Sequence, residues 1–309
     1  MEYISKTLDF HVNEPSVISF GKFDGLHRGH EFLMEKQIEQ SNLHGYKRII
    51  FTFDIPPKAE VLGIESKVII TNEEKEYVFE RSGVDYLVEC PFVPEVMTME
   101  ARAFVKWIVD SLNVRCIVVG DDFRFGHNRA GDHVLLAEMS EELGYELIVV
   151  NKIKDGDRDI SSTYIREEIA AGHIRKANEL LGYPFFIKGR VVHGRQIGRT
   201  IGIPTVNLTV TDNKLLPPYG VYMSKVHVKD NWYQGVTNIG CKPTIDGDNP
   251  VGAETYIIDF SQDVYGQDVM VELHEFIRPE MRFESIDELK RQMSADIDRT
   301  IKYYRNVTE

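Results

Sequence analysis

The spacing of apolar residues in this 309-residue chain changes near position 182, and the two patterns favour different folds. Before it, short continuous apolar runs alternate with helix-like segments; the runs cover residues 17–20, 49–53, 86–88, 117–119 and 147–150. Uninterrupted apolar strands are typical of sheets covered on both faces, and their alternation with helices is typical of βαβ units. The first half therefore predicts a Rossmann-like α/β domain with a doubly wound parallel sheet.

The second half has shorter, β-branched or aromatic segments separated by Gly, Pro, Asp and Asn. They cover residues 189–192, 220–228, 232–236, 254–260 and 269–276. This pattern predicts antiparallel strands in a small barrel or a sandwich. We place the domain boundary near residues 181–184, which gives an α/β domain over residues 1–182 and a mostly antiparallel β domain over residues 183–309.

Capping signals predict where three helices begin. Thr71 with Glu74, and Ser285 with Glu288, have capping-box spacing, while Thr98 is a candidate N-cap residue. The last of these helices carries an apolar stripe, which we expect to pack against the β domain; it is formed by Ile286, Leu289, Met293, Ile297 and Ile301.

Composition excludes several classes of protein. The formal net charge of −13 disfavours a nucleic-acid partner, because phosphate backbones are bound by a surplus of Lys and Arg. No apolar stretch approaches the ~18 residues of a membrane span, and the N-terminus does not resemble a signal peptide. The cysteines at 90, 116 and 241 are far apart, which argues against disulfides and thiolate metal sites. We therefore expect a cytoplasmic protein with no membrane partner; the oligomeric state is left open.

A glycine- and histidine-containing segment follows the first predicted strand. Residues 21–30 read GKFDGLHRGH and precede a predicted helix. Glycines let a backbone approach a ligand, and the start of a helix offers free amides to an anion. His27 and His30 are three residues apart, so both rings point to one side of a first helical turn, where they can hydrogen-bond to phosphates. The alternative is a glycine-rich turn with two surface histidines.

Two further segments belong to the same half. Residues 160–166 read ISSTYIR and open a helix after the fifth strand; Ser162 and Arg166 lie about one turn apart and could share a phosphate, although the hydroxyls could simply be N-caps. Residues 120–126 read GDDFRFG and follow the fourth strand, at the end where ligands bind in open α/β sheets.

The second half carries a longer glycine-rich motif. Residues 194–207 read GRQIGRTIGIPTVN, with glycines at 194, 198 and 202. Such a loop can wrap phosphates with its amides, while Thr205 and Asn207 present a hydroxyl and an amide oxygen on one side of an extended chain. Both are hard oxygen ligands of the kind that Mg²⁺ accepts beside water and nucleotide oxygens. The alternative is a glycine-rich hairpin with Asn in a turn.

Glu254 is the candidate catalytic residue of this half. In the predicted strand 254–260 it alternates onto the same face as Tyr256, Ile258 and Phe260. A carboxylate on an apolar face is desolvated and can accept a hydroxyl proton. The alternative is a carboxylate at a strand end that faces solvent.

Together these motifs resemble the prokaryotic bifunctional riboflavin kinase/FMN adenylyltransferase family, also called FAD synthetases. The likeness runs through both halves in order, from GxFDGxHxGH and ISSTxIR to GxxxGRxxGxPTxN. It continues at residues 218–222, 235–240, 243–244, 254, 265–267 and 277–283. It implies a nucleotidyltransferase-like FMN adenylyltransferase domain followed by a riboflavin kinase domain, a six-stranded antiparallel barrel with a C-terminal helix.

The resemblance also implies ligands and residue roles. The ligands are riboflavin, FMN and ATP with Mg²⁺, and the products are FMN and FAD. In the kinase, Glu254 is the general base and Thr205 and Asn207 bind the metal. In the adenylyltransferase, His27 and His30 contact the ATP phosphates. The remaining ATP-binding positions are Gly21, Phe23, Asp24, Gly25, Ser162, Thr163, Arg166, Gly198 and Gly202, joined by Thr205 and Asn207.

The sequence departs from the family pattern at one position. Members usually read Thr-Phe-Asp-Pro-His-Pro after the second strand, whereas this chain has Pro56 where the histidine stands. A lost hydrogen bond to a charged group costs about 1.5–3 kcal/mol, which would slow adenylyl transfer roughly ten- to a hundredfold. The alternatives are therefore a riboflavin kinase with a weakened or inactive first domain, and a flavin- or nucleotide-sensing regulator without turnover.

Overall fold

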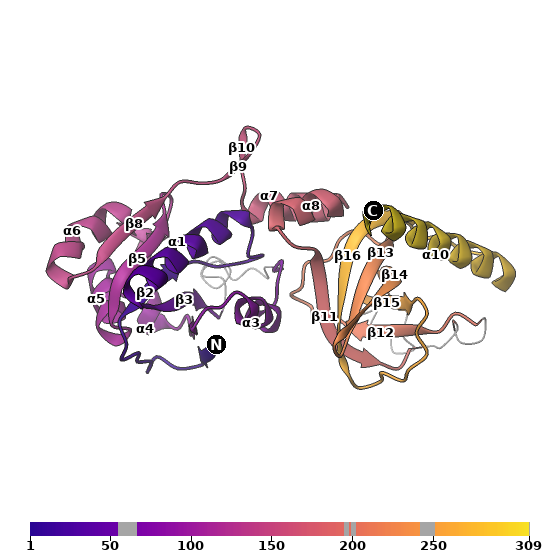
Figure 1. The fold of residues 1–309 in the computed structure, drawn as a ribbon, viewed down its shortest axis with the longest axis horizontal. Helices are drawn as coiled ribbons and strands as arrows, with labels where there is room; N and C mark the ends of the chain where they lie inside the picture. Colours follow the sequence, from indigo (N-terminus) through magenta and orange to yellow (C-terminus); the bar gives the residue numbers. More distant parts are fainter. Residues whose placement is uncertain (55–66, 195–197, 199–201, 242–250, 309) are drawn as a thin grey trace. The chain divides into compact units, whose positions relative to one another are not determined.

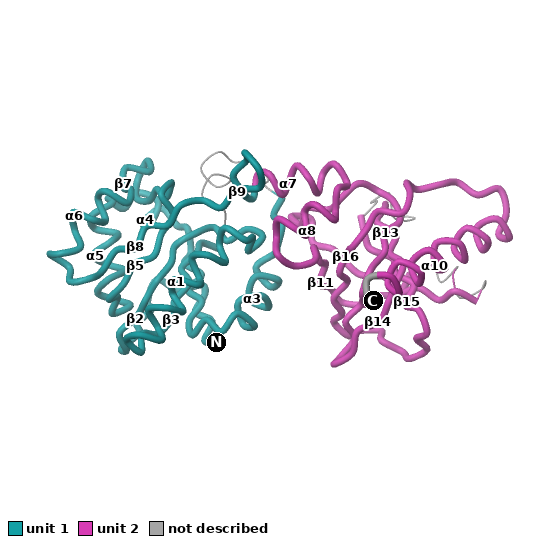
Figure 2. Tube along the Cα trace, turned by 45° about the horizontal axis from the view of Figure 1, so that its top comes forward, with its two compact units in different colours: residues 1–162 teal, residues 163–309 magenta. Residues whose placement is uncertain are grey.

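A computed structural model of the chain describes residues 1–54, 67–194, 198, 202–241 and 251–308. The chain divides into two compact units, Met1–Ser162 and Thr163–Glu309 (Figure 2). The predicted domain boundary at 182/183 lies further along the chain, after two helices of the second unit, α7 (Ser162–Ala170) and α8 (Ile174–Leu181). The position of the domain boundary stays a prediction.

The first unit contains the predicted parallel sheet (Figure 1). Its strand order is β1-β4-β3-β2-β5-β8, and every neighbouring pair is parallel. The strands are β1 (Glu2–Ser5), β2 (Ser16–Phe20), β3 (Lys47–Phe53), β4 (Tyr86–Cys90), β5 (Val114–Gly120) and β8 (Glu146–Val150). The five predicted strands are confirmed, and β1 is an additional edge strand.

Helices cover both faces of this sheet, as the continuous apolar strands require. They are α1 (Arg28–His44), α3 (Asn72–Arg81), α4 (Pro94–Met97), α5 (Ala101–Ser111) and α6 (His133–Leu143). Val17 of β2 packs in a cluster with Leu33 of α1, whereas the next residue, Ile18, packs in a cluster with Phe104 of α5. Successive side chains of β2 therefore pack into two different hydrophobic cores, one on each face of the sheet.

Short elements connect the strands near the sheet's carboxyl edge. One hairpin pairs β6 (Arg124–Phe125) with β7 (Gly131–Asp132) around the 3₁₀ helix His127–Arg129. A second pairs β9 (Lys154–Asp155) with β10 (Arg158–Asp159). Within the described residues, none of the helices combines the length and the apolar character needed to cross a membrane.

The second unit is a closed antiparallel barrel, which decides between the two predicted architectures. The strand order around it is β11-β12-β15-β14-β13-β16. The strands are β11 (Phe185–Val192), β12 (Thr205–Thr209), β13 (Gly220–Val228), β14 (Asn231–Cys241), β15 (Val251–Ile257) and β16 (Asp268–Pro279).

The barrel interior contains hydroxyl groups as well as apolar side chains. Thr237 donates to Ser224 at 2.8 Å and lies 2.9 Å from the hydroxyl of Thr255, and all three residues are fully buried. Because these groups bond to one another, they are satisfied without water. This chain of hydroxyls identifies the inward faces of β13, β14 and β15.

The C-terminal helix α10 (Ile286–Thr308) lies beside the barrel (Figure 1), and the predicted stripe borders its buried face instead of forming the centre of that face. Ile286 is 62% exposed and the rest of the stripe is half-buried, whereas Asp296, Thr300 and Tyr304 are buried. Asp296 accepts three hydrogen bonds from the Arg278 guanidinium of β16, at 3.3, 3.0 and 2.8 Å. This ion pair turns a polar face of the helix toward the barrel.

The capping predictions have mixed outcomes. The Thr71 capping box is confirmed in both directions, at 3.2 and 2.9 Å. At the start of α10, Ser285 Oγ accepts from the Glu288 amide, but the Glu288 carboxylate accepts from the amide of residue 284. Thr98 is wrong as an N-cap: it ends α4, where its hydroxyl donates to the Pro94 carbonyl, and α5 begins after Glu100.

Candidate active sites

The first candidate site is the loop from Gly21 to His27, between β2 and α1. Phe23 is fully buried with φ 45°, and Gly25 has φ 74°. The Phe23 ring contacts Phe79 of α3 edge-on, with 5.4 Å between centroids, and lies 4.9 Å from the His30 ring. A Cβ at Gly21 would lie 3.0 Å from the Phe23 ring, so a larger residue there would crowd the ring. The Phe23 side chain is thus the internal anchor of the loop.

The two histidines lie together at the start of α1. Their rings stack with centroids 3.8 Å apart, which confirms that both point to one side. Gly29 makes room for them, because a Cβ there would lie 3.0 Å from His27 Nδ1. Among the described residues, neither Nδ1 atom has a hydrogen-bond partner. Buried polar atoms of this kind are available to a ligand.

Burial keeps both imidazoles neutral. It lowers the pKa of His27 to about 4, and it lowers the pKa of His30 well below its usual value, with the neighbouring His27 adding to the effect. Neutral imidazole carries one N–H donor and one acceptor. At neutral pH the pair can therefore donate hydrogen bonds to phosphate oxygens without the cost of burying a cation.

Asp24 and Ser162 both make hydrogen bonds that hold this loop in place. Asp24 Oδ1 accepts from the Ile69 amide at 2.7 Å, so the carboxylate ties the loop to the segment before α3. Ser162 Oγ donates to the Asp24 carbonyl at 2.8 Å. This hydrogen bond uses the donor of the Ser162 hydroxyl and leaves its lone pairs, so the expectation that Ser162 and Arg166 share a phosphate stays a prediction, as does ATP binding by Asp24. Thr163 and Arg166 begin the second unit, and their ATP-binding roles stay predictions.

The loop after β5 also lies at the sheet's carboxyl edge, as predicted for residues 120–126. Phe123 stacks between Phe20 and Phe125, with centroids 5.5 and 5.4 Å away. Lys152 binds Asp122 at 2.9 Å. Pro56, the departure from the family pattern, lies outside the described residues.

Sequence reasoning missed a buried ion pair at this edge. Lys75 of α3 and Glu89 of β4 are each 5% exposed, with Nζ 3.4 Å from Oε1. The other Glu89 oxygen accepts a hydrogen bond from the Tyr3 hydroxyl at 2.5 Å. Their positions in the sequence show no motif. Only the burial of a charged pair marks them as unusual.

The second candidate site lies where β12 and β15 pair. Asn207 is directly opposite Glu254, and Thr205 is opposite Tyr256, so the four side chains share a face. Thr205 Oγ1 donates a hydrogen bond to Glu254 Oε1 at 2.5 Å. Asn207 is 5% exposed. The predicted metal ligands and the predicted base are thus neighbours.

The predicted environment of Glu254 is wrong. Ala253, Thr255 and Ile257 of β15 are buried and face the barrel interior, whereas Glu254 and Tyr256 are half-buried on the outward face. Glu254 therefore does not lie on an apolar face. The position of Glu254 is set by the hydrogen bond from the Thr205 hydroxyl and by the pairing of β15 with β12.

The glycine loop passes close to these residues. A Cβ at Gly194 would lie 2.2 Å from Asn207 Nδ2, and one at Gly198 would lie 2.2 Å from the Ile203 carbonyl and 3.4 Å from Thr205 Oγ1. Gly202 has φ 79°, a conformation that favours glycine. Residues 195–197 and 199–201, between these glycines, lie outside the described residues.

The donor set suits one kind of metal. Within the described part of the chain, no group of three or more His, Cys, Asp or Glu side chains could hold an ion. Thr205 and Asn207 offer two neutral oxygens on one face. Mg²⁺ commonly takes few protein ligands and completes its shell with water and phosphate oxygens, so the pair fits Mg²⁺ that arrives with a nucleotide.

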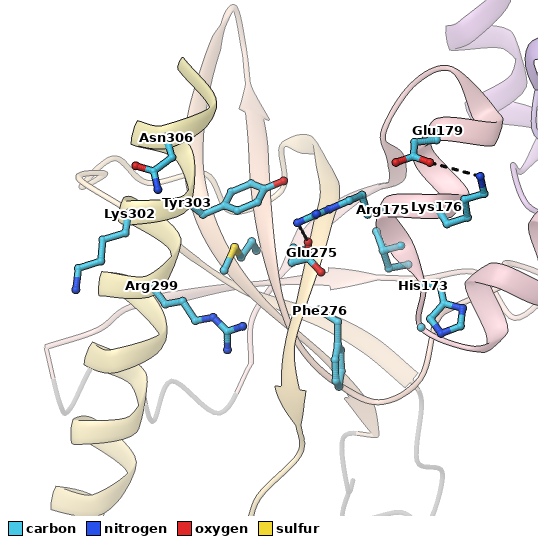
Figure 3. Close-up of a pocket in the computed structure, with 13 residues that line it drawn as sticks. His173, Arg175, Lys176, Glu179, Glu275, Phe276, Arg299, Lys302, Tyr303 and Asn306 are labelled. Carbon is cyan, nitrogen blue, oxygen red and sulfur yellow. Dashed lines mark hydrogen bonds and ion pairs between the residues drawn. The ribbon is translucent and has the colours of Figure 1, made fainter. Parts of the chain in front are cut away.

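A cavity of about 790 Å³ in the second unit is separate from these residues (Figure 3). It lies between α8, β16 and α10, and none of the predicted site residues lines it. Its charges are largely engaged: Arg175 pairs with Glu275, Lys176 lies 3.6 Å from Glu179, and Arg299 donates to a backbone carbonyl of β16. The cavity therefore does not compete with the two sites as a candidate active site.

Comparisons with known proteins agree with the geometry. Residues 9–164 match the family model of FAD synthetase, and residues 181–304 match that of riboflavin kinase. Bifunctional riboflavin kinase/FMN adenylyltransferases from Escherichia coli strain K12 and Bacillus subtilis strain 168 are each 36% identical to the chain. The matches cover 92% and 94% of this chain and 91% and 93% of those proteins.

The same enzyme from Listeria monocytogenes is 31% identical over 98% of this chain and 97% of that protein. A Streptococcus pneumoniae crystal structure, described as a macrolide-efflux protein, is 32% identical with a TM-score of 0.84. It covers 94% of this chain and 95% of that one. Both halves, in this order and at this coverage, show that the chain belongs to the bifunctional riboflavin kinase/FMN adenylyltransferase family.

Proposed function

We propose that the chain phosphorylates riboflavin to FMN in its barrel and then adenylylates FMN to FAD in its α/β unit. ATP is the donor in both steps, with Mg²⁺ as the metal ion. We assign the two activities to residues 183–309 and 1–182, and we place the protein in the cytoplasm because both steps consume ATP. The observation that carries the proposal is the hydrogen bond from Thr205 to Glu254, beside Asn207 and the glycine loop.

In the kinase step, Glu254 is the general base. Its carboxylate accepts the proton of the 5′-hydroxyl of the ribityl chain, and the oxygen attacks the γ-phosphorus of ATP, so that the bond to the β-phosphate oxygen breaks and ADP leaves. Thr205 holds Glu254 in place through their hydrogen bond. Thr205 and Asn207 would hold Mg²⁺, which would neutralise charge on the phosphates.

In the adenylyl-transfer step, an FMN phosphate oxygen attacks the α-phosphorus of ATP and pyrophosphate leaves. His27 and His30 donate hydrogen bonds to phosphate oxygens, which stabilises charge that develops in the transition state. The free amides at the start of α1 add to this anion site. Asp24 and Ser162 maintain the loop that carries both histidines.

A second candidate function is riboflavin phosphorylation alone. It is favoured by Pro56, which replaces a histidine that the family usually has. Chromatography of products from riboflavin, ATP and Mg²⁺ separates the alternatives. FMN together with FAD supports the bifunctional proposal, FMN alone supports the kinase, and no conversion supports a flavin- or nucleotide-binding regulator.

A further inference from the structure

Lys75 is the center of a set of contacts at the carboxyl edge of the parallel sheet. Its ammonium group is buried, 3.4 Å from Glu89 Oε1 and 3.3 Å from Asn72 Oδ1. The Asn72 amide in turn donates to the carbonyl of Asp54, the residue after β3, at 3.0 Å. Lys75 therefore links α3 to the ends of two neighbouring strands, β3 and β4.

The same helix supports the loop that carries the histidines. The Asp24 carboxylate binds the backbone at Ile69, two residues before the N-cap of α3. Phe79, one turn after Lys75 on the buried face of α3, packs on Phe23, and Phe23 packs on His30. The position of α3 therefore sets the position of the His30 ring.

The charges around Lys75 explain why this position holds a cation. Burial lowers the pKa of Lys75, and Glu89, Asp24 and Asp54 act in the opposite direction, so three carboxylates influence its ammonium group. These carboxylates follow or end the strands β2, β3 and β4, at the edge where ligands bind in open α/β sheets. Without a neighbouring cation they would repel a polyphosphate.

We propose that Lys75 is a positioning residue of the adenylyl-transfer site. It holds the start of α3 against the strand ends and thereby keeps the Asp24 loop and the His27–His30 pair in the geometry that binds ATP. It also offsets the carboxylates that border the site. The proposal rests on the adenylyltransferase function proposed above and adds a residue outside the glycine- and histidine-containing motif.

The test compares three full-length variants. Lys75→Met keeps the length of the side chain and removes its charge; Lys75→Met with Glu89→Gln also removes the buried counter-charge. Lys36→Met is the control, since Lys36 forms a surface pair with Glu39 on α1, at 2.8 Å. Riboflavin phosphorylation by the same polypeptide reports whether the second unit is intact, and thermal unfolding reports the stability of the first.

We expect the double variant to separate the effect of Lys75 on thermal stability from its effect on ATP binding. Lys75→Met raises the KM for ATP in FAD formation by at least about tenfold, equivalent to ~1.4 kcal/mol, while phosphorylation of riboflavin is unchanged. The double variant regains thermal stability because no unpaired charge stays buried, yet it keeps the raised KM. Lys36→Met behaves like the wild type.

Two results would overturn the proposal. A normal KM in Lys75→Met removes any role in ATP binding, and a KM restored in the double variant reduces Lys75 to a counter-ion for Glu89. If the single variant does not fold, the double variant decides alone.

If the wild type forms no FAD, the adenylyltransferase function fails separately. Calorimetric titration of ATP into Asn207→Ala proteins, with and without the Lys75 change, then decides whether Lys75 supports nucleotide binding in the first unit.

Discussion

A methyl group at position 194 should disable the proposed metal site although neither of its ligands is substituted. The Cβ of Gly194→Ala would lie 2.2 Å from Asn207 Nδ2, whereas real Cβ atoms essentially never approach a heavy atom closer than 3.0 Å. The amide must therefore retreat by about 0.8 Å. Asn207 is 5% exposed and lies opposite Glu254, so its displacement disturbs the face of β12 and β15 that carries Thr205 and Glu254.

The size of this shift sets the expected effect. Metal–ligand distances in proteins hold to within about 0.2 Å, so a displacement several times larger takes the amide oxygen out of coordination. Changes that merely reorient ligands already cost roughly 10–100-fold in metal affinity. The Mg²⁺ concentration for half-maximal riboflavin phosphorylation should therefore rise at least about tenfold in Gly194→Ala.

The assay measures phosphorylation rate against Mg²⁺, with FAD formation from added FMN as the internal control for the other unit. Gly266→Ala is the matched control, because Gly266 has φ 72° but its Cβ would lie 3.7 Å from the nearest atom. It should lose about 1–2 kcal/mol of stability through backbone strain and keep a normal Mg²⁺ dependence. A normal Mg²⁺ requirement in Gly194→Ala would refute the placement of Asn207 at the metal.

Three further predictions concern the titratable and catalytic residues. Glu254→Gln should lower the kcat of riboflavin phosphorylation at least about a hundredfold, the lower bound for general-base catalysis, with Mg·ATP binding retained; near-normal turnover would exclude it as the base. His30→Ala should impair FAD formation alone, and equal loss of both activities in product assays would contradict two separate sites. Because His27 stays neutral in the fold down to about pH 4 but takes up a proton near pH 6.5 when unfolded, stability should fall by about 3 kcal/mol as the pH drops through this window. Urea denaturation at several pH values measures this loss, and His27→Gln should make the profile less steep without flattening it, because burial lowers the pKa of His30 as well; an unchanged slope would contradict the buried neutral ring.

Local patterns in the sequence were sufficient for most of the fold. Alternate residues of β2 serve the two cores of a doubly wound sheet, and this is what a continuous apolar strand requires. The edge strand β1 escaped prediction because it is short, pairs only with β4 and carries no apolar run. The sequence indicates an extended chain at Thr205–Asn207 but does not identify strand β12, since its pairing with β11 and β15 depends on residues distant in the sequence.

The sites show where periodicity stops being informative. Alternation separated Glu254 from Thr255 correctly, but it could not tell which face turns inward, because the barrel interior is lined partly by the hydroxyls of Ser224, Thr237 and Thr255. The hydrogen bond from Ser162 to the Asp24 backbone spans 138 positions, and no local pattern encodes it. The burial of Lys75 is likewise a product of tertiary packing.

The most direct test of the two-step chemistry uses ATP labelled at one phosphorus at a time. With riboflavin, Mg²⁺ and [γ-³²P]ATP, label should appear in FMN and remain in FAD, since the transferred phosphoryl group becomes the flavin phosphate. With [α-³²P]ATP, label should appear in FAD and never in FMN. Flavin that carries no label from the γ-phosphate would contradict phosphorylation by the barrel, and with it the assignment of Glu254, Thr205 and Asn207.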